Sequence, residues 1–162
     1  MEFNGLPLHP LVIHAVVVFA PLAAVTAIAY AVRPGWRWAL RWPLVAMTVI
    51  AAGAAVIAAL SGQNLAETRG LDALPAVRTH QERGELLRNI LLGFTVVVGL
   101  AAWRLGGPSG LKSGRGERPT GDGGRTGVVE IVVMGLLVVG AVAVGVAVFL
   151  AGDSGSRAVW EL

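Results

Sequence analysis

Four apolar runs, each close to the length needed to cross a lipid bilayer, limit the folds open to this chain. They cover residues 11–32, 43–61, 86–105 and 128–151. A transmembrane helix needs about 20 consecutive apolar residues, and a spanning segment surrounded by lipid forms a helix because lipid offers its backbone no hydrogen-bond partners. The pattern predicts an all-α fold. We expect a four-helix transmembrane bundle, up-down-up-down, in a single integral membrane domain over residues 1–162.

The composition favours a membrane protein and excludes several kinds of site. Hydrophobic residues make up 55% of the chain and charged residues only 14%, whereas a typical soluble domain has about 25% charged residues. The chain has no cysteine, so disulfides, iron–sulfur clusters and thioether-attached haem are excluded. The basic residues lie between apolar runs rather than on a folded basic face, and we therefore expect no nucleic-acid partner.

The segments between the apolar runs differ in character. Residues 33–43 hold three arginines and three tryptophans, a composition typical of a tight helical hairpin at the level of the lipid headgroups. Residues 106–127 are dominated by Gly, Ser, Pro, Lys and Arg, and such a segment cannot bury enough apolar surface to order itself. We expect a flexible basic loop there.

Local signals mark the start of two helices. Pro10 suits the first turn of the first helix, where its missing N–H costs nothing, and this leaves His9 at the cap position. Thr79 and Glu82 match a capping box, so the third helix is predicted to begin at His80. Both signals place a histidine at the start of a helix.

An even number of crossings puts both termini and the second connection on the same side of the membrane. That side then holds polar residues that are scattered in the sequence: His9, His14, Glu67, His80, Glu82 and Asp153. The two loops on the other side carry eight Lys and Arg residues against five, and the positive-inside rule places the richer side in the cytoplasm. We expect a multi-pass protein of the plasma membrane with extracytoplasmic N- and C-termini.

Histidines at the threshold of a membrane helix need a partner, because ionisable groups are costly in lipid. His14 and His80 begin different helices at one membrane face, which makes them the candidate cofactor-binding residues, and haem b is the candidate cofactor. His9, Glu67 and Asp153 are candidate metal ligands. His9 and His14 lie about 140° apart around a helix and are not expected to share one ion. Two alternatives stay open: each histidine only caps a helix end, or another metal binds.

Several short motifs carry a resemblance to a known family. The opening Leu8-His9-Pro10-Leu11-Val12-Ile13-His14, the pair Ser61-Gly62 and the spacing from His80 to Gly84 together resemble the bacterial predicted membrane proteins of domain-of-unknown-function family 2231. The resemblance covers nearly the whole chain. It implies a four-helix integral membrane domain, sometimes fused or neighbouring to cytochrome-like modules, with no settled activity.

The resemblance also implies a Gly-His-x-Gly element after the last helix. The matching residues here are Gly152-Asp153-Ser154-Gly155, so an aspartate stands where the family has histidine. If that position were a ligand, a carboxylate would suit a hard cation better than haem iron.

The residues contain no motif of a known catalytic centre, such as a nucleophile elbow, a phosphate loop or an HExxH pair. We therefore do not predict an enzyme. The leading functional hypothesis is a membrane module that binds b-type haem or a metal and supports electron transfer or respiratory assembly, with respiratory or cytochrome-like membrane proteins as partners beside the lipid bilayer. The alternatives are a structural or regulatory membrane protein without a cofactor, and a small solute or ion carrier.

Overall fold

The computed structural model describes residues 2–3, 6–106 and 127–160. It confirms the predicted helical membrane fold. The helices are α1 (Leu8–Val32), α2 (Arg37–Arg69), α3 (Pro75–Arg104) and α4 (Val128–Trp160). Each of them is long and apolar enough to cross a membrane. The predicted loop at 106–127 lies outside the described residues except for its two end positions.

Two small elements accompany the helices. The 3-10 helix η1 (Pro34–Trp36) forms the short turn between α1 and α2. The strands β1 (Glu2–Phe3) and β2 (Leu6–Pro7) pair in antiparallel fashion directly before α1. The apolar pattern did not predict this short pairing.

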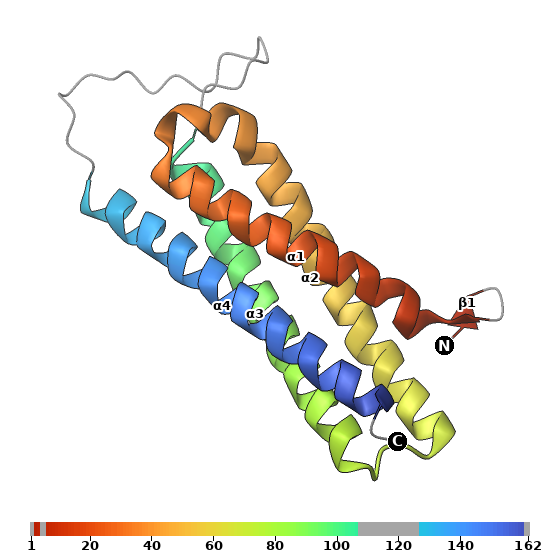
Figure 1. Ribbon diagram of the computed structural model, residues 1–162. Coiled ribbons are helices and arrows are strands. Elements are labelled where there is room, and N and C mark those ends of the chain that lie inside the picture. Colours follow the sequence, from red (N-terminus) through yellow and green to blue (C-terminus); the bar gives the residue numbers. More distant parts are fainter. Residues whose placement is uncertain (1, 4–5, 107–126, 161–162) are drawn as a thin grey trace.

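The helices run alternately up and down in a bundle (Figure 1). The closest packing joins α1 to α2 and α3 to α4, while α2 with α3 and α1 with α4 close the bundle. Both termini and the connection from α2 to α3 lie at one end. We call it the histidine end, because α1 and α3 begin there with His9, His14 and His80. The opposite end carries η1, and we call it the arginine end.

The ends of α2 and α3 at the histidine end follow local chemistry. Gly70 adopts φ 64° after α2, and its N–H bonds the carbonyls of Ala66 and Glu67, as a left-handed C-cap does. Pro75 then occupies the first turn of α3. The predicted start of this helix at His80 is therefore wrong. The Thr79 hydroxyl does not cap the helix and instead donates to the Pro75 carbonyl, at 3.0 Å.

Small side chains dominate the bundle interior. Alanines such as Ala20, Ala27 and Ala51 are fully buried, and small residues allow helices to approach closely inside lipid. Large apolar side chains point outward, for example Val96 with 63% and Phe149 with 72% exposure. Such an apolar outer surface fits a lipid bilayer rather than water.

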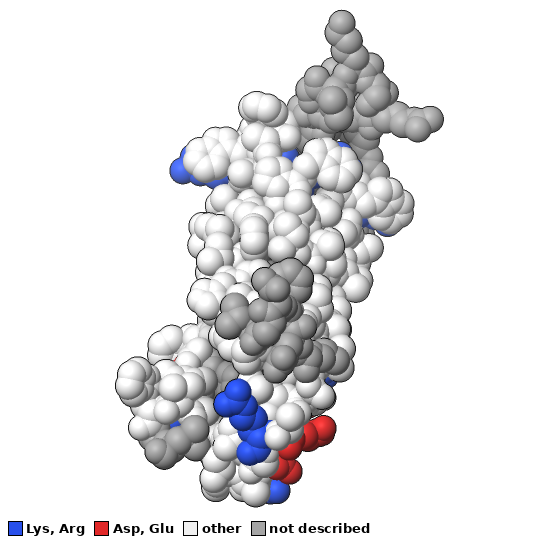
Figure 2. All heavy atoms as spheres, turned by 90° about the vertical axis from the view of Figure 1, so that its right-hand side faces the viewer, with Lys and Arg blue, Asp and Glu red and all other residues white. Residues whose placement is uncertain are grey.

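Charged side chains gather toward the two ends of the molecule on the face shown in Figure 2, and red spheres gather at the histidine end. At the arginine end, the Arg37 guanidinium donates to the carbonyls of Tyr30 (3.1 Å) and Ala31 (3.4 Å), which end α1. The buried Tyr30 hydroxyl donates to the Gly106 carbonyl at 2.9 Å. Four exposed tryptophans lie at this end: Trp36, Trp38, Trp42 and Trp103. This arrangement is typical of a helical hairpin at the membrane interface.

Candidate functional site

A cavity of about 490 Å³ lies at the histidine end, and all four helices contribute to its wall. Pockets of about 300–1,000 Å³ hold small molecules and cofactors. The wall is mostly apolar, with side chains such as Val16, Leu87 and Val148. Two imidazoles, those of His9 and His80, also line it. A largely apolar wall with a few polar groups is the usual form of a ligand site in a helical bundle.

His9 reaches the cavity from the first turn of α1 and is fixed by α2. Its Nδ1 lies 2.8 Å from the carbonyl oxygen of Ala58. A carbonyl only accepts hydrogen bonds, so Nδ1 carries a proton, and in the neutral form of the ring the lone pair lies on Nε2. The ring rests against Gly62, where an added Cβ would lie 2.9 Å from Nδ1. We call Gly62 the glycine seat of this imidazole, because its missing side chain leaves space for the ring.

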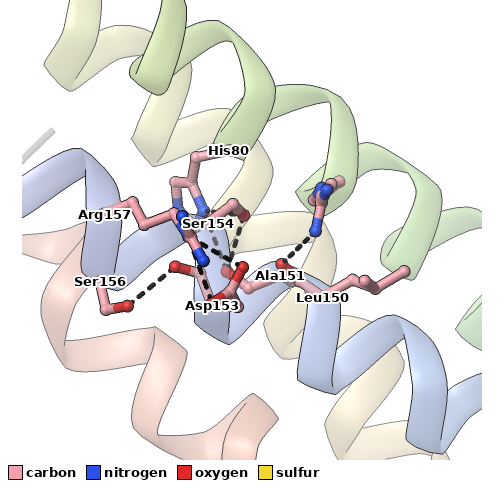
Figure 3. Close-up of polar contacts among 8 residues, drawn as sticks. His80, Leu150, Ala151, Asp153, Ser154, Ser156 and Arg157 are labelled. Atoms are coloured by element: carbon pink, nitrogen blue, oxygen red, sulfur yellow. Dashed lines mark hydrogen bonds and ion pairs between the residues drawn. The ribbon is translucent and has the colours of Figure 1, made fainter.

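His80 is held in the same manner by α4 (Figure 3). Its Nδ1 lies 3.2 Å from the Ala151 carbonyl oxygen and 3.3 Å from the Ser154 hydroxyl oxygen. The carbonyl again selects the form with the proton on Nδ1. The ring rests against Gly155, where an added Cβ would lie 3.0 Å from Cε1.

The two imidazoles are neighbours, although α1 and α3 lie diagonally across the bundle. Their ring centres are 6.0 Å apart, and the ring planes are inclined by 80°. In their neutral forms both rings keep an Nε2 lone pair that the carbonyls of Ala58 and Ala151 do not use. The cavity therefore combines an apolar wall with two nitrogen atoms that can accept a hydrogen bond or bind a metal.

The residues expected to form the site do not all meet. His80 faces His9 rather than His14, whose exposed ring bonds the Pro10 carbonyl of its own helix. His14 does not line the cavity. It lies on another face of α1 because five positions turn a helix well away from the starting direction.

The carboxylates predicted as metal ligands also lie elsewhere. Glu67 is exposed and outside the cavity wall, and Asp153 pairs with Arg157 at 3.2 Å. Across residues 2–3, 6–106 and 127–160, no group of three or more His, Asp or Glu residues is arranged to hold a metal ion. Within the described part of the chain, the imidazoles of His9 and His80 do lie close together, with ring centres 6.0 Å apart.

Other parts of the site were missed by sequence reasoning. Gln63 donates to the Glu85 carboxylate at 2.8 Å, and both side chains line the cavity. The spacing from His80 to Gly84 carries part of the family resemblance, yet an added Cβ at Gly84 would meet nothing within 4 Å. The seats are Gly62 and Gly155 instead. A glycine on a different helix cannot be assigned to a histidine by spacing alone.

Comparisons with known proteins point to a family. The sequence model of the family described as "Predicted membrane protein (DUF2231)" matches residues 5–162. This range includes all four helices and both histidines of the cavity. No curated protein and no solved structure matches the chain significantly.

Proposed function

The chain belongs to the DUF2231 family of predicted membrane proteins, and from this premise we propose that it is an integral membrane module that binds one b-type haem between His9 and His80. The observation that carries the proposal is the pair of imidazoles in one apolar cavity. A bound haem supplies reversible one-electron chemistry. We infer electron transfer within the membrane as the function.

The separation of the two imidazoles supports a metal atom held between them. Each metal–nitrogen bond is about 2 Å long, so with half a ring width on each side, two imidazoles that share one metal atom have ring centres about 6 Å apart. The observed separation of His9 and His80 is 6.0 Å. A metal-bound histidine usually donates its other N–H to a carbonyl or carboxylate. Both rings make such a bond, to Ala58 and Ala151.

The number of available ligands favours haem over a bare ion. A structural or catalytic metal ion usually takes three or four protein ligands, and the described residues offer no such group. A haem would need only two protein ligands, and His9 and His80 could supply them. The apolar side chains around His9 and His80 would cover the macrocycle, and the cavity wall also contains the small residues Ala59 and Gly152.

Electron transfer needs a donor and an acceptor. We therefore expect respiratory or cytochrome-like membrane proteins as partners, as the family resemblance implies. The excess of Lys and Arg in the loops at the arginine end supports our prediction of a plasma-membrane protein with extracytoplasmic termini. Reaction of single engineered cysteines with a membrane-impermeant reagent, possible because the chain has none of its own, tests this orientation.

An absorption spectrum tests the proposal. We expect the full-length protein, purified in detergent from haem-replete cells, to show a Soret band and the sharp visible bands of a reduced six-coordinate b-type haem. H9A and H80A should each lose the six-coordinate spectrum. H14A is the matched control and should keep it, because His14 lies outside the cavity. A protein without a Soret band, or one whose spectrum survives both H9A and H80A, would overturn the proposal.

A further inference from the structure

The helix segments that hold the two histidines have the same five-residue sequence pattern. Residues 58–62 and 151–155 both read Ala-x-x-Ser-Gly. In each pattern the alanine carbonyl accepts from the imidazole, and the glycine lies beneath the ring. The serine hydroxyl also lies within hydrogen-bond distance of the same carbonyl. Ser154 donates to the Ala151 carbonyl at 3.0 Å, and Ser61 lies 3.2 Å from the Ala58 carbonyl while it donates to the Ile57 carbonyl at 2.7 Å. In α2 and in α4, an alanine carbonyl and a glycine at the same spacing thus hold one histidine ring.

The agreement continues along the helices. When α1 and α3 are aligned by His9 and His80, six of the seven buried residues of α1 match the six buried residues of α3. When α2 and α4 are aligned by their Ala-x-x-Ser-Gly patterns, six of the seven buried residues of α4 match buried residues of α2. The matched helices therefore bury corresponding positions along their whole length, and not only at the residues that hold the histidines.

Matched positions exchange small and large side chains. Ala20 matches Leu91 and Ala27 matches Val98, whereas Tyr30 matches Ala101, and all of these residues are at most 1% exposed. Packed cores tolerate such exchanges when the total volume is kept. This explains why the two halves show little residue identity outside the pattern.

The packing has the same symmetry. Exchanging α1 with α3 and α2 with α4 turns each hairpin into the other, and it turns the α2–α3 contact into the α1–α4 contact. Along the sequence, the histidine and the carbonyl that accepts its hydrogen bond are 49 residues apart in the first hairpin and 71 residues apart in the second. Most of this difference lies in the longer connection between α3 and α4.

We infer that the chain is a tandem repeat of one helical hairpin and that its cavity consists of two equivalent half-sites, in which Ser61 and Ser154 position the histidines. The hairpins are related by an approximate two-fold axis along the bundle, as in membrane proteins built from parallel repeats. Each half-site supplies one imidazole, one accepting carbonyl, one serine and one glycine seat. The two histidines then hold a single shared ligand in equivalent ways, whatever its identity.

Nitrogen NMR of the full-length protein with ¹⁵N-labelled histidine tests this inference. The protein is reduced with dithionite, so that any six-coordinate haem iron is diamagnetic. We expect His9 and His80 both to carry the proton on Nδ1. G62A should shift the ring nitrogens of His9 and G155A those of His80, by similar amounts, because each added Cβ would lie within 3.0 Å of a ring atom. G53A and G145A are controls in the same helices, outside the cavity wall, with nothing within 4 Å of the added Cβ.

The serine variants form a second pair that leaves the glycine seats intact. S61A should shift the resonances of His9 alone and S154A those of His80 alone, and threonine at each position should restore them. The inference fails if the two histidines protonate different nitrogens, or if one variant of a pair moves its own histidine and the other does not. These readouts do not require haem, so their outcome is separate from that of the absorption test.

Discussion

Replacing Gly140 by alanine tests the packing of α4 against α3. An added Cβ at Gly140 would lie 2.7 Å from Cδ2 and 3.1 Å from Cε2 of Phe94. Phe94 is only 3% exposed, so its ring has little room to move. Overpacking a core costs about 1–3 kcal/mol, whereas alanine in a helix is favoured over glycine by roughly 0.5–1 kcal/mol. We expect Gly140→Ala to lower the free energy of unfolding by up to about 2.5 kcal/mol.

Gly145 provides the matched control on the same helix. It is exposed, and an added Cβ there would meet nothing within 4 Å. Gly145→Ala keeps the helix-propensity gain without the clash, so the two variants should differ by the full overpacking cost of about 1–3 kcal/mol. Equilibrium unfolding in mixed micelles, followed by circular dichroism, measures both. Equal stability of the two variants would refute the close packing of Gly140 against Phe94. In the double variant, Phe94→Leu should reduce the loss of stability that Gly140→Ala causes.

Three further substitutions separate buried from exposed polar contacts, and micellar unfolding measures each. Tyr30→Phe should cost about 1–2 kcal/mol, because it removes a buried hydroxyl that bonds the Gly106 carbonyl; no loss of stability would contradict this. Thr48→Val should change stability by less than about 0.5 kcal/mol, because the buried hydroxyl bonds the Leu44 carbonyl of its own helix, and a larger loss would indicate an interhelical contact of this hydroxyl. Asp153→Asn removes an exposed ion pair with Arg157 and should have a similarly small effect while leaving the haem spectrum unchanged; a lost spectrum would make Asp153 part of the site.

The membrane fold was predictable because it depends on the length of apolar runs. Lipid forces each long run into a helix, and four crossings bring the beginnings of α1 and α3 to one end of the bundle. The sequence alone therefore groups the histidines at one end. The orientation of the bundle in the membrane stays a prediction from the distribution of Lys and Arg.

The partner of His80 was not predictable, for a physical reason. Nearly every position of α1 is apolar, so periodicity does not reveal which face of the helix meets the bundle. His14 therefore seemed as suitable as His9. His9, and not His14, lies in the cavity beside His80 because His9 contacts Ala58 and Gly62 on another helix. The repeated Ala-x-x-Ser-Gly pattern was visible in the sequence, but small residues are common in membrane helices, and only the bonds to His9 and His80 give it meaning.

Electron paramagnetic resonance of the oxidised protein tests the central claim most directly. If His9 and His80 hold the iron of a haem between them, the oxidised protein would give a low-spin ferric signal. We expect this signal in the wild type and in His14→Ala, because His14 lies outside the cavity, and its loss in His9→Ala and His80→Ala. A protein without a low-spin iron signal, or one that keeps it when either cavity histidine is removed, would contradict the account.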